Sequence, residues 1–246
     1  MTLKEYLDNP SGKGSSTNNK EVLRNFLNRF DKFKEEKRVI KIDFVKDAKK
    51  FFIVAKVQSG SLDKLFYDCI IEITPEDKAN KDFMNNGKFK VFINSPSFTF
   101  TFANAFLGKD MIITQLKHKY SKEVLKENPE IRNPYKMIGY EKIFVFTLLE
   151  LVRHYRNKTL DDFREFKGIL ALLDKQLRTS EEILREYSLL KDKLAKEKKK
   201  EKELEKKRKE EEAKTVLANK SSQSHIKAKI KPNVSKVIKP KRKLFK

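Results

Sequence analysis

The apolar residues between positions 19 and 36 recur three and four places apart, as they do along one face of a helix. They are Val22, Phe26, Leu27, Phe30 and Phe33. Asn18 or Asn19 can cap this helix, because a side-chain oxygen there accepts a hydrogen bond from a free backbone N–H group. The pattern predicts an amphipathic helix over 19–36. It is preceded by an N-terminal arm over 1–18 that ends in a loop of small and polar residues.

From residue 40 onward the apolar spacing changes to two, which is typical of strands with one buried face. Four such runs follow one another, separated by polar turns: Ile40–Phe44, Phe51–Val57, Leu65–Ile73 and Phe89–Ile93. Aromatic and β-branched residues dominate all four, as they do in strands. We expect an antiparallel meander whose apolar face is covered by helices.

The segment that follows these strands is mostly helical in its pattern. Phe98–Phe102 alternates with threonine, so strand and helix both remain open there, and a helix could begin within Ala103–Leu107. Residues 110–126 indicate one or two short helices. Tyr140–Asn157 has a continuous apolar stripe and basic residues at its C-terminal end, which suit the helix dipole. The fold class predicted for 19–158 is therefore α+β, an antiparallel sheet packed against helices.

Residues 159–213 predict a long charged helix or a helical hairpin. Apolar residues step through its first part at heptad spacing: Phe163, Phe166, Leu170, Leu173 and Leu177. Thr179–Glu182 either caps a second helix or lies within a continuous one. Beyond Leu194, blocks of lysine and glutamate place opposite charges four residues apart, each pair worth about 0.2–0.5 kcal/mol. A coiled coil through 163–194 and a solvated spacer helix both fit this pattern.

The distribution of charge separates a third segment, 214–246, from the rest of the chain. The 246 residues include 57 Lys+Arg and 35 Asp+Glu, a net charge of +22, and 214–246 holds 11 basic and no acidic residues. This basic tail has few large apolar residues, so burial cannot offset the entropy of ordering it. We expect it to be extended, and disordered until a partner orders it.

The basic residues of this tail are the candidate contacts with nucleic acid or with an acidic partner. They are Lys227, Lys229, Lys231, Lys236, Lys239, Lys241, Arg242, Lys243 and Lys246. Neutralising phosphates would release counterions and make binding steeply salt-dependent. Apolar residues alternate with the lysines, so the tail could instead add a strand to a partner's sheet, or it could remain a solvated segment.

Composition argues against several classes of protein. One cysteine cannot form an internal disulfide, and three scattered histidines with one cysteine argue against a zinc site. No apolar run approaches the roughly 20 residues of a membrane span, and the N-terminus has no apolar signal region. We expect no membrane partner.

No motif in this sequence predicts a catalytic site. Gly12–Ser16 lacks the first glycine and the preceding strand of a phosphate-binding loop. We expect His118 and His154 to be surface or partly buried residues and Cys69 to be a core residue. The acidic pairs after Thr159 and Thr179 are expected to be first-turn acids of helices. The phenylalanine-rich runs suit a core better than a base-stacking platform. We expect a non-enzymatic protein with no cofactor, metal or small-molecule ligand.

Three short stretches of this sequence resemble a group of tailed-bacteriophage virion structural proteins. They are the opening Lys4–Ser15 (KEYLDNPSGKGS), the central Asn94–Ala103 (NSPSFTFTFA), and Arg132–Tyr135 followed by Gly139–Lys142 (RNPY and GYEK). The resemblance covers about residues 1–157. The charged helix and the basic tail depart from the compact members of that group.

The resemblance implies a non-enzymatic component of the neck or tail of a phage particle, in the region of the head–tail connection. Its partners would be other virion proteins, in a symmetric homo-oligomer or ring, and its location the virion and, during virion assembly, the host bacterial cytoplasm. The alternative is a nucleic-acid-binding or packaging-associated protein that uses the basic tail. A third interpretation is a helical adaptor of a cellular complex, held by a coiled coil.

Overall fold

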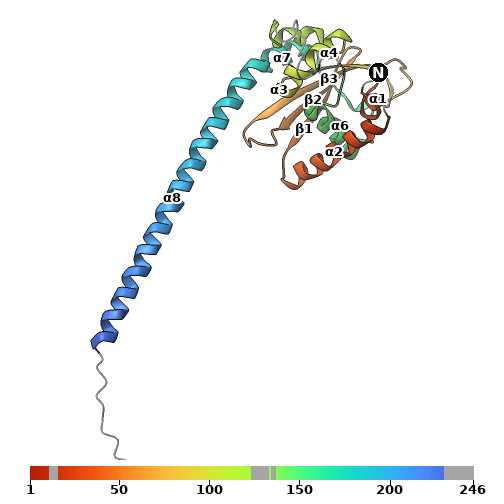
Figure 1. Ribbon diagram of the computed structural model, residues 1–246. Helices are drawn as coiled ribbons and strands as arrows, with labels where there is room; N and C mark the ends of the chain where they lie inside the picture. The colour runs from red at the N-terminus through yellow and green to blue at the C-terminus, as the bar shows by residue number, and fades with distance from the viewer. Residues whose placement is uncertain (11–15, 123–132, 134–136, 230–246) are drawn as a thin grey trace, which may run out of the picture. The chain divides into compact units, whose positions relative to one another are not determined.

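The computed structural model describes residues 1–10, 16–122, 133 and 137–229, and Figure 1 shows its helices and strands. The chain divides into two units, Met1–Lys191 and Asp192–Lys246. All the strands that the structure describes belong to the first unit, and the described part of the second is the remainder of one helix.

The first unit is built on a five-stranded sheet in the order β4-β3-β2-β1-β5. The strands β1 (Ile40–Asp47), β2 (Lys50–Gln58), β3 (Phe66–Thr74) and β4 (Lys88–Ile93) pair antiparallel in chain order. This confirms the predicted meander. The short β5 (Arg164–Glu165) then pairs with β1 in the parallel direction, so the sheet is mixed.

Helices cover one face of this sheet, which confirms the α+β class (Figure 1). The helix α6 (Lys142–His154), predicted over Tyr140–Asn157, lies against β2 and β3. The ring centroids of Phe144 on α6 and Phe89 on β4 are 5.4 Å apart. The helix α2 (Ser16–Glu35) packs on α6 through the rings of Phe30 and Phe33, which contact Phe146. α2 begins three residues before the predicted start.

The opposite face buries a second apolar layer. Phe52, Ile70 and Phe92 have no exposed surface there, and Phe92 contacts the ring of Tyr120, which follows the 3-10 helix η1 (Thr114–Lys119). The helix α7 (Ile169–Gln176) lies against β1 and η1. Of the predicted 110–126 segment, η1 is a short helix and Lys122 is again helical, whereas 123–126 lie outside the described residues.

The N-terminus differs from the predicted arm. Residues Leu3–Asp8 form the helix α1, which begins with a capping box between Thr2 and Glu5. Tyr6 has no exposed surface, and its hydroxyl donates to the carbonyl oxygen of Gly139 at 2.7 Å. The sequence did not reveal this helix because six residues contain too few apolar positions to establish a period.

Residues 96–108 are helical, which decides the open choice between strand and helix. Ser95 caps α3 (Pro96–Thr101) by accepting the N–H of Phe98 at 3.1 Å. Pro96 occupies the first turn, where a backbone N–H would have no partner within the helix, so the proline costs no hydrogen bond. The helix α4 (Ala103–Gly108) follows directly.

The heptad seam predicted from Phe163 to Leu177 is wrong. Phe163 directly follows the 3-10 helix η2 (Leu160–Asp162) and is buried. Its ring centroid lies 5.2, 5.3 and 5.9 Å from those of Phe44, Phe51 and Phe83. β5 follows, and Gly168 adopts a left-handed φ of 75° before α7 begins. The apolar residues of the predicted seam therefore lie on or next to three different elements, η2, β5 and α7, and pack into the core of the first unit.

A new helix, α8 (Ser180–Lys229), begins after a break at Leu177–Thr179. Thr179 Oγ1 accepts the N–H of Glu182 at 3.1 Å, and the Glu182 carboxylate accepts the N–H of Thr179 at 2.7 Å. Of the two possibilities left open for this segment, the cap of a second helix is the one observed. Ile183 is fully buried, so the first turns of α8 belong to the core.

In the second unit, α8 exposes every side chain from Asp192 to Glu212. Ion pairs four residues apart line it, with Lys209 Nζ 2.6 Å from Glu205 and Lys206 Nζ 4.0 Å from Glu210. The helix continues to Lys229 and so passes the predicted end at Ala213, because 214–229 contains no proline and several good helix formers. No helix within the described ranges is long and apolar enough to cross a membrane.

Candidate functional site

The nine basic residues proposed as contacts lie at the end of the chain. Lys227 and Lys229 fall on the last turn of α8, where only the backbone is described. The other seven lie outside the described residues: Lys231, Lys236, Lys239, Lys241, Arg242, Lys243 and Lys246. Their contact with nucleic acid or an acidic partner stays a prediction.

The first unit carries a different cluster of positive charge. Lys41, Lys56, Lys64, Phe66 and Arg178 line a surface hollow of about 240 Å³, which we call the basic hollow. The strand register positions its floor, because Lys41 of β1 and Lys56 of β2 stand directly opposite each other. Lys64 comes from the β2–β3 loop and Arg178 from the link between α7 and α8.

Arg178 is held in place by two partners. Its Nη1 pairs with the Glu186 carboxylate of α8, and its Nη2 donates to the carbonyl oxygen of Phe66 at 2.6 Å. These contacts fix the α7–α8 link to the start of β3, and they neutralise the guanidinium. The lysines Lys41, Lys56 and Lys64 form no ion pair with any residue of the described ranges.

One buried acid lies next to the basic hollow. Asp68 stands opposite Lys56 in the sheet and is 4 % exposed. Asn94 bonds it twice, with Nδ2 2.7 Å from Oδ2 and Oδ1 2.8 Å from the backbone nitrogen. Burial raises the pKa of the Asp68 carboxyl, whereas its bond to Asn94 and the charges of Arg178 and Lys56 act to lower it.

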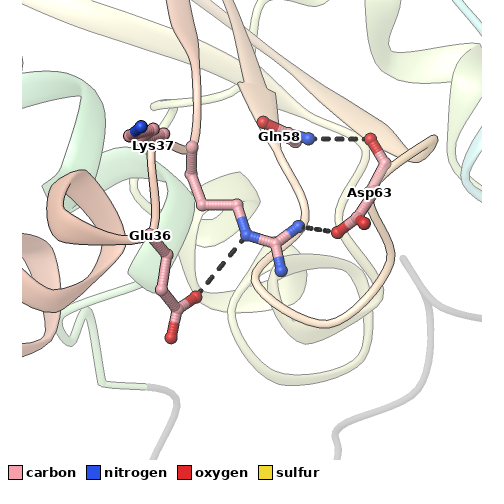
Figure 2. Close-up of a pocket in the computed structure, with 5 residues that line it drawn as sticks. Glu36, Lys37, Gln58 and Asp63 are labelled. Carbon is pink, nitrogen blue, oxygen red and sulfur yellow. Dashed lines mark hydrogen bonds and ion pairs between the residues drawn. The ribbon is translucent and has the colours of Figure 1, made fainter.

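A second hollow, of about 460 Å³, lies where the α2–β1 turn meets the β2–β3 loop (Figure 2). Arg38 pairs there with Asp63 and, through Nε at 3.5 Å, with Glu36. Gln58 Nε2 donates to the carbonyl oxygen of Asp63 at 2.8 Å. Arg38 is thus neutralised by two acids of its own chain, and the network joins two loops. Lys37, which also lines the hollow, forms none of these bonds.

The interior holds a polar cluster of Tyr6, Ser95 and Glu141, which we call the buried junction. Glu141 caps α6, accepting the N–H of Phe144 at 2.8 Å through one carboxylate oxygen and the hydroxyl of Ser95 at 2.9 Å through the other. Its own N–H donates to the Tyr6 hydroxyl at 3.2 Å. Burial raises the pKa of Glu141 to about 7, although these hydrogen bonds act to lower it.

A carboxyl group that titrates near neutrality has the pKa of a general acid or base. Glu141, however, has no exposed surface and lines neither hollow. Both of its oxygens are also engaged by groups of its own chain. The buried junction is therefore a structural element that joins α1, α3 and α6.

Other residues singled out from the sequence take the places expected of them. Cys69 is fully buried, and burial raises the pKa of its thiol, so it stays protonated as a core residue. His118 is exposed, with Nε2 2.8 Å from Asp174. Asp162 caps η2 by accepting the N–H of Thr159 at 2.7 Å.

The aromatic runs are mainly core, as predicted. Phe89, Phe92 and Phe98 are buried, whereas Phe100 is 37 % exposed. Gly12–Ser15 of the loop compared with a phosphate loop lies outside the described residues. Within the described ranges, no group of three or more His, Cys, Asp and Glu side chains could hold a metal ion.

Sequence reasoning did not find the basic hollow. Lys41 and Lys56 each occupy an ordinary polar position of an alternating strand, and only the pairing register brings them together.

Comparison of the chain with protein-family models, with curated proteins and with solved structures gives no match.

Proposed function

We propose that this protein is a non-enzymatic structural component of a tailed-phage particle, in its neck or tail, that assembles with other virion proteins. The observation that carries the proposal concerns the three stretches that resemble such proteins. Tyr6 belongs to the first, Ser95 to the second and Glu141 to the third, and these residues meet at the buried junction. Three stretches that are spread over more than a hundred positions of the sequence therefore contribute to one buried cluster. This is expected if the resemblance reflects a shared fold.

The long helix α8 supports an assembly role. Between Asp192 and Glu212 its side chains are all exposed, so no packing within the described chain stabilises this stretch. A helix without tertiary contacts is marginal unless ion pairs or a partner support it. The exposed stretch of α8 offers a surface along which neighbouring subunits can pack, consistent with a ring or other symmetric oligomer.

The proposal is tested on particles of the virus that encodes this chain. We expect antibodies raised against the full chain to label purified particles at one fixed position near the head–tail connection. Deleting the gene should leave heads and tails that do not join or tails that do not complete. Purified, infectious particles that contain none of this protein would refute the proposal.

Nucleic-acid binding is the second candidate, favoured by the excess of positive charge in 214–246. The test is a DNA and RNA titration of the full chain at about 50 and 200 mM salt, the interval in which several phosphate contacts weaken binding by orders of magnitude. The matched variant replaces the nine basic candidates by glutamine in the full-length chain. Salt-sensitive binding that disappears in the variant supports this candidate, whereas weak binding unchanged by the variant supports a tail that contacts protein.

A further inference from the structure

The basic hollow sets two like charges against each other on rigid neighbouring strands. Lys41 and Lys56 are both exposed and are direct partners in the antiparallel register. Directly opposite residues have Cβ atoms about 4.5–5.5 Å apart, and like charges in that position destabilise a sheet. An anion held between the two ammonium groups removes this repulsion.

The surrounding acids do not supply that anion. Glu186 is paired with Arg178, and Asp68 is buried and bonded to Asn94. Lys64 adds a third ammonium group from the β2–β3 loop to the same hollow. Three positive charges therefore converge there with no ion pair among the residues that the structure describes.

The type of donor available points to one class of anion. Recognition of a carboxylate by a protein typically uses the planar fork of an arginine, but Arg178 is already engaged by Glu186 and the Phe66 carbonyl. The free donors are ammonium groups, which bind phosphate as point charges. Several of them around one hollow suit an anion with many oxygens and more than one charge.

We infer that the basic hollow binds phosphate groups, supplied either by a nucleic-acid backbone or by a free polyphosphate. The half-buried ring of Phe66 lies beside the lysines, and aromatic rings next to cations are characteristic of surfaces that hold single-stranded nucleic acid. This inference does not rest on the proposed virion role, nor on the basic tail.

The test uses thermal unfolding of the full chain, because the hollow exists only when the strands are paired. A ligand that binds the folded chain alone raises the melting temperature, whereas an anion held by charge irrespective of fold binds the folded and unfolded chains alike and gives no shift. The probes are pyrophosphate, a short oligothymidylate, and a polyglutamate peptide of similar charge. The oligothymidylate and pyrophosphate arms distinguish the two sources of phosphate.

The variant Lys41→Gln/Lys56→Gln is compared with Lys49→Gln/Lys109→Gln, which removes the same charge from exposed positions outside the hollow. We expect one or both phosphate probes to raise the melting temperature of the unsubstituted chain and of the control. In the hollow variant, the dissociation constant derived from that shift should rise on the order of tenfold or more, as expected for lost charge-assisted hydrogen bonds. Lys64→Gln, in a loop, serves as a second variant if the first does not fold.

Three results would overturn the inference. The first is the absence of any shift with both phosphate probes, and the second is an equal loss of the shift in the control. The third is a shift with polyglutamate that is as large as that with phosphate and is lost in the same variant, since it would assign the hollow to an acidic protein segment.

Discussion

Replacing Glu141 by glutamine should change how the stability of the first unit depends on pH. Glu141 is fully buried, and burial raises the pKa of its carboxyl from 4.5 to about 7. Between these values the folded chain holds a proton that the unfolded chain releases. The contribution of this group to stability is therefore complete below pH 4.5, and it is lost as pH rises through about 7.

The size of the effect follows from the displacement of the pKa. Each unit corresponds to about 1.4 kcal/mol, so the free energy of unfolding should fall by about 3 kcal/mol between pH 4.5 and pH 7 owing to Glu141 alone. Glutamine keeps an oxygen that can accept the N–H of Phe144, but it does not titrate. The Glu141→Gln variant should lack this fall. Between pH 4.5 and pH 7.5, its free energy of unfolding should therefore decrease by about 3 kcal/mol less than that of the unsubstituted chain.

The assay is urea unfolding at pH 4.5, 5.5, 6.5 and 7.5, followed by the near-ultraviolet circular dichroism of the tyrosines. This signal reports the tertiary packing of the tyrosines, which all belong to the first unit, and not the helicity of α8. Glu21→Gln, an exposed substitution on α2, is the control and should reproduce the pH profile of the unsubstituted chain. The raised pKa of Asp68 is common to all three proteins, so the difference isolates Glu141. Identical slopes for the Glu141→Gln variant and the unsubstituted chain would refute the reasoning.

Three further substitutions test the packing. Tyr6→Phe removes the hydroxyl that donates to Gly139 and leaves a buried N–H without its acceptor, so urea unfolding should show a loss of about 1–3 kcal/mol. Thr179→Ala removes the cap that accepts the N–H of Glu182 and should lower the unfolding free energy by about 0.5–2 kcal/mol. Phe163→Ala opens a cavity among three aromatic rings and should destabilise the chain by about 3–5 kcal/mol without changing its mass in light scattering.

Two further substitutions serve as comparisons for these experiments. Tyr155→Phe changes a half-buried tyrosine, and Leu189→Ala shortens a side chain that is 66 % exposed, so both should stay within about 0.5 kcal/mol of the unsubstituted chain. A change in oligomeric state after Phe163→Ala, with stability unaltered, would restore the heptad interpretation that the structure contradicts.

The elements that local pattern determines were predictable because their apolar periods are long and uninterrupted. The stripe within Tyr140–Asn157 gave α6, and the four alternating runs gave β1 to β4 in their order. The segment beginning at Phe163 was misread because a spacing of three and four is compatible with a coiled coil and with core residues on separate elements. The left-handed Gly168 and the parallel pairing of β5 with β1 interrupt that segment.

The sequence by itself determined the composition of the three segments, the α+β class, the helix-forming charged stretch and the concentration of positive charge at the end of the chain. These depend on local period and on residue counts. Only the tertiary structure decided that Tyr6, Ser95 and Glu141 meet at one buried junction, and that Lys41, Lys56, Lys64 and Arg178 share one hollow. Strand register and helix packing bring together residues far apart in the chain, and no short-range pattern encodes which of them will become neighbours.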